Sequence, residues 1–272
     1  MGSALELPRL PAAPQEVMAR TARGAAIAPG TGDNMGAALG LSLGPGDVSV
    51  SIGTSGVCAM VSASRPGDAS GAVTGFADAT GRFLPMATTI NASRILEAAR
   101  ALLGVSHEEL SQLALASVPG AHGVTLLPYF DGERTPNRPD ARATLTGMST
   151  ATTREDVARA YVEGLLCSLA DGISALEDRT GTAPARITLI GGAARSQAVQ
   201  QLAPAIFGRE VTIAPEGEYV ALGAARQAAW ALAGTEEPPA WTITGSRTVD
   251  AEATPEVLET YRALKNRTES WG

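Results

Sequence analysis

The strongest helical pattern in the chain lies between Thr153 and Arg179, where apolar residues recur every three or four positions. This spacing places them on one face of a helix. The residues are Val157, Tyr161, Leu165, Leu169, Ile173 and Leu176. Shorter stretches of the same kind predict further helices over residues 33–43, 92–103, 106–116, 196–207, 219–233 and 255–267.

The segment DVSVSIGTSGVCAMVS, residues 47–62, alternates between apolar and polar positions on both sides of a Gly-Thr-Ser-Gly turn. This pattern predicts a β-hairpin. Further strands are predicted in GRFLPMATTI, ARITLIGG and REVTIAP. A hairpin followed by alternating helices and strands indicates a layered α/β domain with a mixed sheet, whose ligands meet the loops at the strand ends.

Two stretches show neither the helical spacing nor the alternation of a strand. Residues 1–21 are punctuated by proline and predict an extension or linker. Residues 124–149 begin with an apolar run and continue as a polar stretch of turn-forming residues, which predicts a long loop. A loop of that length inside a domain is usually functional or disordered. Within it, Glu133 and Arg134 are interpreted as a surface ion pair.

Composition narrows the class of protein. The 272 residues are 44% hydrophobic and only 4% aromatic, with 30 glycines, which indicates a core of small side chains. The net charge of −7 is spread along the chain without a Lys/Arg cluster, which excludes a nucleic-acid-binding surface. No apolar run approaches the ~20 residues of a membrane helix and no signal peptide is recognisable, so no membrane partner is predicted.

Cysteine and histidine usage indicates the cellular compartment. Cys58 and Cys167 lie far apart, and the two histidines, His107 and His122, are not grouped with them. This distribution excludes a zinc site and a disulfide framework, and it fits a reducing environment. The protein is therefore predicted to be soluble and cytoplasmic, and these four residues are assigned no function.

The stretch IAPGTGDNMGAALG, residues 27–40, places an acidic residue, Asp33, directly after a Gly-Thr-Gly turn. Three interpretations compete: Asp33 caps a helix, the glycines hold a dinucleotide, or Asp33 is a catalytic carboxylate at the edge of a cleft. The dinucleotide interpretation is disfavoured, because the glycine spacing is one residue off the fingerprint and Pro29 removes a hydrogen-bond donor from the preceding strand.

Two glycine-rich loops are candidates for binding an anion. Residues 53–57, GTSGV, lack the spacing of a nucleophile elbow. They form either a plain turn or a hairpin tip whose N–H groups and hydroxyls make an anion-binding concavity. Residues 189–196, LIGGAARS, bring two glycines from a strand to a helix start. That arrangement suits a phosphate or a flat ring system, but it is also a common corner in α/β proteins.

The order of these motifs resembles a known family. GTGDN, SIGTSG, LPYFDGERTP, LIGGAARS and ALGAA follow one another as in the C-terminal half of the FGGY carbohydrate kinases, and within them the xylulokinases, over about residues 7–233. The resemblance implies an actin-like (RNase H-like) ATPase domain over residues 30–234, with a mixed sheet and helices on both faces. It is one of two domains that close around ATP and a sugar. Residues 1–29 then correspond to the passage out of a missing N-terminal domain, and residues 235–272 to a tail with one helix.

The resemblance also implies roles for individual residues. Asp33 corresponds to the general base that takes the proton from the sugar hydroxyl, with helix capping as a compatible second role, and Asn34 to its neighbour at the sugar. A phosphate loop corresponds to Gly53, Thr54 and Ser55. Further nucleotide contacts correspond to Asn91, Gly191, Gly192 and Ser196. The implied cofactors are ATP and Mg²⁺, and no metal ligand is assigned in this chain.

The implied reaction transfers a phosphoryl group from ATP to a ketopentose such as D-xylulose. The family's first phosphate loop and most of its sugar contacts belong to the missing domain, so the chain alone is expected to be inactive. A separately encoded N-terminal half, or a second copy of the chain, is then the expected partner. The alternative is a non-catalytic nucleotide-binding or interaction domain.

Overall fold

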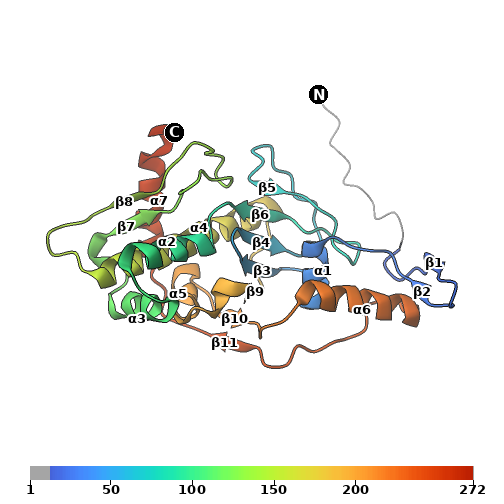
Figure 1. Cartoon of the computed structure of the whole chain (residues 1–272). Helices are drawn as coiled ribbons and strands as arrows, with labels where there is room; N and C mark the ends of the chain where they lie inside the picture. The colour runs from blue at the N-terminus through green and yellow to red at the C-terminus, as the bar shows by residue number, and fades with distance from the viewer. Residues whose placement is uncertain (1–12, 272) are drawn as a thin grey trace.

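The computed structural model describes residues 13–271, and its central feature there is a mixed sheet of seven strands (Figure 1). In their order across the sheet the strands are β11 (Arg247–Val249), β10 (Val211–Ile213), β9 (Arg186–Ile190), β3 (Asp47–Ile52), β4 (Gly56–Met60), β6 (Met86–Thr89) and β5 (Val73–Thr74). β9 is parallel to both β3 and β10, and the other neighbouring pairs are antiparallel. The mixed sheet predicted from the sequence is confirmed.

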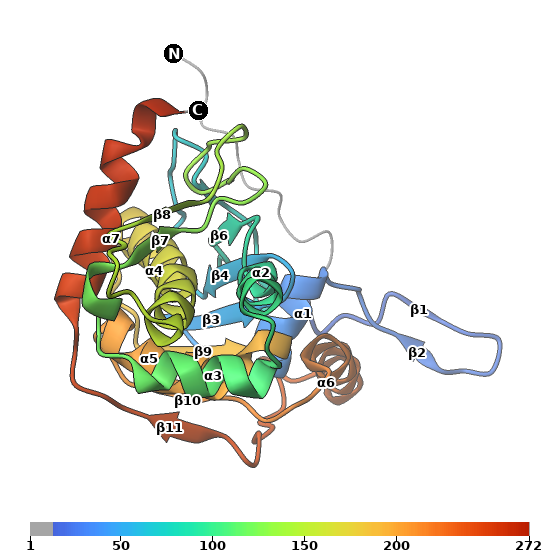
Figure 2. The same cartoon turned by 60° about the vertical axis from the view of Figure 1, so that its left-hand side comes forward.

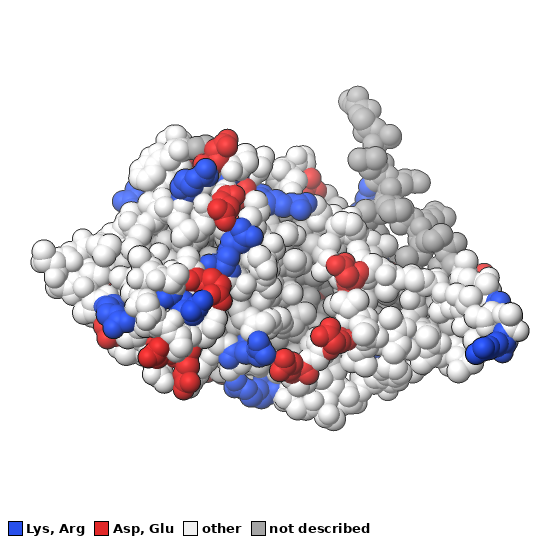
Figure 3. Space-filling view, viewed as in Figure 1, with Lys and Arg blue, Asp and Glu red and all other residues white. Residues whose placement is uncertain are grey.

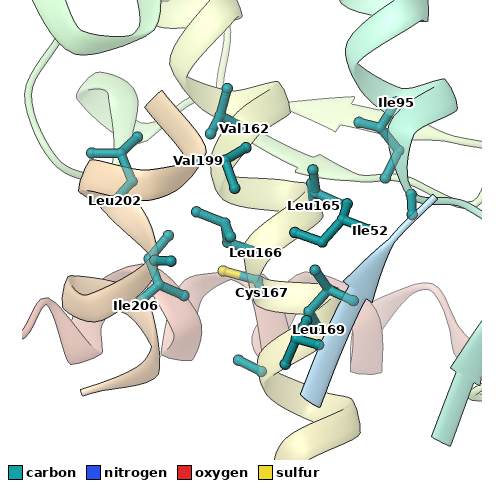
Figure 4. Packing of buried hydrophobic residues seen from close by; sticks show 14 of the residues in the cluster. Ile52, Ile95, Val162, Leu165, Leu166, Cys167, Leu169, Val199, Leu202 and Ile206 are labelled. Atoms are coloured by element: carbon teal, nitrogen blue, oxygen red, sulfur yellow. The ribbon is translucent and has the colours of Figure 1, made fainter. Parts of the chain in front are cut away.

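One face of the sheet packs against α4 (Arg154–Thr180), which lies at the centre of the main hydrophobic core (Figure 4). Val48, Val50 and Ile52 of β3 are fully buried in this core, because alternate residues of a strand point to the same face. The helices around α4 are α2 (Ser93–Leu103), α3 (His107–Ala116), α5 (Gln197–Phe207) and α7 (Pro255–Arg267) (Figure 2).

α4 is buried nearly all round, whereas its sequence pattern predicts a single apolar face. Every residue from Asp156 to Ala170 is buried, including Arg159 and Glu163, whose side chains form an ion pair of 2.5 Å. The reason is that the sheet and the surrounding helices enclose α4 on all sides. That is the environment of a central helix and not of a surface helix.

The opposite face of the sheet is covered by α1 (Asp33–Gly40) and α6 (Tyr219–Ala233). Their side chains form a second, smaller core with residues of β4 and its extension, including Ala59 and Val61. These strand residues alternate with the ones that enter the main core, as the pleat requires. Helices therefore cover both faces of the sheet, as predicted.

α1 and α6 cross each other at glycine residues. A Cβ atom on Gly223 would lie 1.8 Å from Gly36 O, and one on Gly40 would lie 2.2 Å from Tyr219 O. No real Cβ atom tolerates such distances, so the two backbones approach as closely as they do only because these positions lack a side chain. The ALGAA motif, which contains Gly223, thus fixes the position of α1.

Two short ribbons complete the described strands. β1 (Ala19–Arg20) and β2 (Ala26–Ile27) form a ribbon that projects from the body of the molecule (Figures 1 and 2). β7 (Thr125–Leu127) pairs with β8 (Thr144–Thr146). The sequence pattern predicts neither ribbon, and the second one lies within the long loop predicted over residues 124–149. Residues 1–12 of the predicted linker lie outside the described residues. Single 3₁₀ turns occur at η1 (Ala121–Gly123), η2 (Gly192–Arg195) and η3 (Glu269–Trp271).

Residues after α6 contribute to the same sheet and core. β11 pairs with β10 at the sheet edge, and Val257, Tyr261 and Leu264 of α7 are buried in the main core. α6 and α7 span the residues predicted for them, whereas α1 ends at Gly40 and not at Leu43. β11 escapes prediction from sequence because it is short and mostly exposed, and it carries no alternating pattern.

Both cysteines, Cys58 and Cys167, are buried and free. Burial raises the pKa of the Cys58 thiol to about 12, so at neutral pH this thiol stays protonated. Within residues 13–271, no helix combines the length and the apolar character needed to cross a lipid bilayer.

The start of α4 depends on Asp156. Its carboxylate closes a capping box with Thr153, accepts a hydrogen bond of 2.6 Å from the Ser117 hydroxyl, and lies 2.8 Å from His122 Nδ1. The Ser117 hydroxyl above all, together with His122 and Thr153, outweighs the effect of burial and holds the pKa of the Asp156 carboxyl well below its usual range. Asp156 therefore ties the turn after α3 to the first turn of α4.

Replacing Asp156 by asparagine is expected to lower the free energy of unfolding by about 1–3 kcal/mol at neutral pH, because a buried charged acceptor is lost. The folded-state pKa is lowered, so the carboxylate stabilises the fold above its unfolded-state pKa of about 3.9, and this stabilisation is lost as the pH falls toward the folded-state value. Urea unfolding of both forms at about pH 7, 5 and 3 should show a difference that shrinks below pH 5. Glu155→Gln, in the same turn, is the control and should unfold like the parent. A difference for D156N that stays constant with pH contradicts this account.

Candidate functional site

Two glycine-rich loops come together at one end of the sheet. β3 leads into the loop at Gly53 and β9 into the loop at Gly191, and the two strands are parallel neighbours with Ser51 opposite Ile190. The carboxyl ends of parallel strands meet at the same edge of a sheet, so the loops lie side by side there. The strand register thus places both loops at one end of the sheet.

The first loop is the tip of the β3–β4 hairpin. The Gly53 N–H donates to Ser55 O across the turn at 3.2 Å, and the Gly56 N–H donates to Thr89 Oγ1 at 3.2 Å. Thr54 and Ser55 are exposed, and their backbone N–H groups take no part in these bonds. Free N–H groups and hydroxyls at such a tip form the kind of concavity that binds anions.

The second loop is pressed against the first at Gly191. This residue has a φ of +92°, and a Cβ atom on it would lie 2.8 Å from Ile52 O, so only glycine fits. The 3₁₀ turn η2 follows and leads to Ser196, the N-cap of α5, whose hydroxyl accepts a hydrogen bond of 3.4 Å from the Val199 N–H. The predicted glycine pair before a helix is confirmed, but α5 does not follow the pair directly. The 3₁₀ turn η2, which begins at Gly192, comes first.

A pocket of about 750 Å³ opens beside the two loops. Its lining comes from both loops, from α2 and α3, and from the start of α5. Of the residues predicted to bind nucleotide, four line this pocket: Gly53, Thr54, Gly192 and Ser196. Gly191 lines a second pocket of about 320 Å³, to which Gly192 also contributes, and Ser55 lies at the neighbouring hairpin tip.

Sequence reasoning misses the wall that α2 and α3 form. Ser111 Oγ lies 3.0 Å from Ser196 Oγ, and His107 Nε2 lies 2.9 Å from Glu97 Oε1; all four side chains line the pocket. His107 therefore has a place at the site, although the sequence assigns it no function. No local signal marks these residues, because α2 and α3 meet the glycine loops only in the folded chain.

Asp33 and Asn34 lie apart from this pocket, at the start of α1 on the other face of the sheet. The Asp33 side chain is exposed, and its Oδ1 accepts hydrogen bonds from the Asn34 backbone N–H at 2.8 Å and from Asn34 Nδ2 at 3.2 Å. The N-cap of α1 is Gly32, so the capping role predicted for Asp33 is wrong. Asp33 is the first helical residue, and its negative charge there interacts favourably with the positive end of the helix dipole.

Asn91 is placed behind the loops and not in the pocket. Its side chain is fully buried, and Nδ2 donates to Gly132 O at 2.7 Å and to Glu133 Oε2 at 3.1 Å. Glu133 is only 1% exposed, so the interpretation of Glu133 and Arg134 as a surface ion pair is wrong. The Glu133 carboxylate instead accepts a hydrogen bond of 2.8 Å from the backbone N–H of Arg134.

Charge around the site is mixed. Figure 3 shows Lys and Arg intermingled with Asp and Glu over one face of the molecule. At the pocket, Arg195 Nη1 lies 3.1 Å from Glu216 Oε1. Burial raises the pKa of the Glu133 carboxyl, against the lowering effect of its hydrogen bonds from Ile90 and Arg134. Across residues 13–271, no three His, Cys, Asp or Glu side chains are grouped so that they could hold a metal ion.

Comparisons with known proteins agree with this geometry. The model for the FGGY family of carbohydrate kinases, C-terminal domain, matches residues 48–232. The xylulose kinase of Streptomyces rubiginosus is 44% identical over 218 residues, which are 80% of this chain and 44% of that protein. The crystal structure of xylulose kinase from Bifidobacterium adolescentis matches with a TM-score of 0.87 at 51% identity, over 93% of this chain and 52% of that one.

A more distant structure, the glycerol kinase of Plasmodium falciparum with ADP, matches with a TM-score of 0.74 at 18% identity, over 90% of this chain and 51% of that one. At this identity the likeness concerns the fold alone, which is the predicted actin-like ATPase fold. The chain spans about half the length of the relatives it matches. The family match includes both glycine loops and the α2–α3 wall of the pocket. The chain belongs to the FGGY family of carbohydrate kinases and contains that family's C-terminal domain.

Proposed function

We propose that this chain is the nucleotide-binding half of an ATP-dependent sugar kinase. The observation that carries the proposal is the pocket at the carboxyl ends of the parallel strands β3 and β9, lined by both glycine loops. Its volume of about 750 Å³ falls in the range of small-molecule sites, ~300–1,000 Å³. Parallel strand ends are also where α/β proteins bind their ligands.

The two loops offer different chemistry to a nucleotide. The tip at Thr54 and Ser55 supplies backbone N–H groups and hydroxyls, which suit phosphate oxygens. The second loop supplies an open glycine surface at Gly192 and the hydroxyl of Ser196, which contacts Ser111 of the α2–α3 wall. A flat nucleoside can lie against such a surface because no side chain projects from it. These residues fit ATP.

Asp33 is proposed as the general base for a sugar hydroxyl, with Asn34 beside it. Asp33 is exposed and Asn34 is half-buried, and Asn34 donates two hydrogen bonds to one oxygen of the Asp33 carboxylate, which leaves the other oxygen available. A general base contributes ~10²–10⁴-fold to a rate. The proposed sugar is D-xylulose, because relatives that are 43%, 44% and 51% identical to this chain are named xylulose kinases.

Magnesium is proposed to enter with the nucleotide. The ion would neutralise negative charge on the phosphate oxygens during phosphoryl transfer. Mg²⁺ is usually held by one or two carboxylates together with substrate phosphates, so it does not need a complete set of protein ligands. The part of the chain that the structure describes supplies N–H groups and hydroxyls to the phosphates and no grouped carboxylates to the ion.

The opposite wall of the site is proposed to come from a second domain. The β1–β2 ribbon and its approach carry exposed apolar side chains at Val17, Met18 and Ile27, which suit contact with another protein surface. A separate N-terminal half of the kinase is the proposed partner, with a second copy of the chain as the alternative. The cytoplasmic location predicted from the cysteines remains a prediction.

These 272 residues alone are expected to give no xylulose-dependent ADP release. Holding two reactants in place contributes ~7–11 kcal/mol to catalysis, and that positioning requires both walls of a cleft. A coupled ADP-release assay with D-xylulose, ATP and Mg²⁺ should therefore give the same background rate for the chain and for Asp33→Ala. Sugar-dependent turnover that Asp33→Ala abolishes would contradict the expectation and show that these residues form a complete kinase. A folded chain that fails to bind ADP at all would instead support a non-catalytic interaction domain.

A further inference from the structure

Glu133 is a buried carboxylate, and within residues 13–271 no Lys, Arg or His side chain forms an ion pair with it. Its Oε1 accepts hydrogen bonds from the Ile90 N–H at 2.5 Å and the Arg134 N–H at 2.8 Å. Its Oε2 accepts from Asn91 Nδ2 at 3.1 Å and the Asn91 N–H at 3.5 Å. All four donors are neutral amides. Burying a charge in this way is costly, and burial raises the pKa of Glu133 accordingly. Stability alone therefore does not explain why a glutamate occupies position 133.

The segment that Glu133 holds is itself bonded to the hairpin tip. The Ala92 N–H donates to Thr54 O at 3.1 Å, and the Ser93 N–H donates to Gly53 O at 2.8 Å. Thr89 Oγ1 accepts from the Gly56 N–H at 3.2 Å and donates to the carbonyl oxygen of residue 91 at 3.0 Å. Residues 89–93 therefore hold both sides of the tip by hydrogen bonds, and the Glu133 carboxylate holds residues 90 and 91 by accepting hydrogen bonds from their backbone N–H groups.

Glu133 is held in turn by the C-terminal helix. The backbones of Glu133 and Arg138 exchange two hydrogen bonds of 2.8 Å. The Arg138 guanidinium donates to Lys265 O at 3.0 Å and to Thr268 Oγ1 at 3.2 Å, at the end of α7, and it lies 5.8 Å from the Tyr129 ring centroid. A continuous set of contacts thus runs from α7 through Glu133 to the hairpin tip.

We propose that Glu133 is a positioning residue that sets the conformation of the Gly53–Ser55 loop, so that the Thr54 and Ser55 N–H groups point outward to a phosphate. The inference rests on the proposed nucleotide-binding function. It requires a carboxylate specifically: both oxygens accept from N–H groups, so the NH₂ of a glutamine would face a donor in either orientation. Asn91 then acts through Glu133 and not by touching the nucleotide.

The test uses Glu133→Gln, which keeps size and shape, with Asp131→Asn as the matched control. Asp131 is an exposed carboxylate of the same loop whose ion pair with Arg94, at 2.7 Å, contributes little at the surface. Hydrogen exchange without nucleotide should become at least about tenfold faster in E133Q for the hydrogen-bonded amides of residues 53–56 and 89–93, which in the tip are Gly53 and Gly56, with α4 amides unchanged. ADP affinity, measured by isothermal titration, should fall about tenfold, the loss expected for one charge-assisted hydrogen bond. D131N should match the parent in both measurements.

The exchange measurement separates this inference from the proposed function, because it needs no nucleotide. Faster exchange confined to the two segments supports the positioning role even if ADP does not bind. Unchanged exchange at Gly53 and Gly56 overturns it, and so does an equal acceleration throughout the chain, which a purely structural role would produce. If E133Q fails to fold, Asn91→Ala, which removes a single donor to the carboxylate, should give a smaller, equally local acceleration. No local change in N91A then overturns the inference.

Discussion

Replacing Gly223 by alanine is expected to lower the free energy of unfolding by about 3 kcal/mol or more, the upper part of the range for overpacking. Helix propensity alone predicts the opposite sign, because alanine stabilises a helix interior by about 1 kcal/mol relative to glycine. Packing outweighs propensity here: the new Cβ atom would lie 1.8 Å from Gly36 O and 2.6 Å from its carbonyl carbon. Both are backbone atoms, so no side-chain rotation relieves the clash, and α1 and α6 must separate.

Gly36→Ala provides the matched control on the facing helix. A Cβ atom there would lie 3.4 Å from Val220 O, an ordinary contact, so this variant should be neutral or slightly more stable than the parent. Urea unfolding of the parent, G223A and G36A measures both effects. A G223A chain as stable as the parent would show that α1 and α6 do not cross at this glycine, and it would remove the basis for placing Asp33 at the start of a fixed helix.

Local signals were sufficient for the parts of the site that lie on single elements. The alternation around GTSG predicts the β3–β4 hairpin, and the glycines of LIGGAARS predict the turn from β9 toward α5. The bounds of α6 and α7 follow from helical spacing. The two loops meet because β3 and β9 are parallel neighbours in the folded sheet.

Residues whose partners lie on other helices, strands or loops could not be predicted from local sequence patterns. Glu133 looks like a surface residue in a run of turn formers, and only the folded chain places it behind residues 90 and 91. The α2–α3 wall, with His107 and Ser111, reaches the pocket only through tertiary packing. α4 carries polar residues such as Arg159 within its buried length, where pairing with Glu163 compensates for burial. Sequence periodicity cannot report a partner that lies elsewhere in the chain.

Replacing Gly192 by valine is expected to weaken ADP binding by about tenfold or more while leaving the fold intact. Gly192 is exposed, its φ lies outside the left-handed region, and a Cβ atom on it would have no neighbour within 4 Å. The backbone therefore accepts a side chain at this position. Gly192 also lines both pockets at the glycine loops, so an isopropyl group there occupies the space proposed for the nucleoside.

Gly67→Val provides the control for that substitution. Gly67 is likewise exposed, has a φ outside the left-handed region, and would place a Cβ atom with no neighbour within 4 Å, but it lies outside the pockets beside the glycine loops. Any general effect of placing a β-branched residue at an exposed glycine should appear in both variants. A difference in ADP affinity between Gly192→Val and Gly67→Val thus reflects nucleotide binding in the pocket and not the stability of the chain.

The most direct test of the central claim, that the pocket beside the two glycine loops holds an adenine nucleotide, is an isothermal titration with ADP. The parent and Gly67→Val should bind ADP at one saturable site with the same affinity, and Gly192→Val should bind it about tenfold more weakly or not at all. Circular dichroism should first show that all three chains are folded. Equal ADP affinity in the three folded chains, or no ADP binding by the folded parent, would contradict the claim.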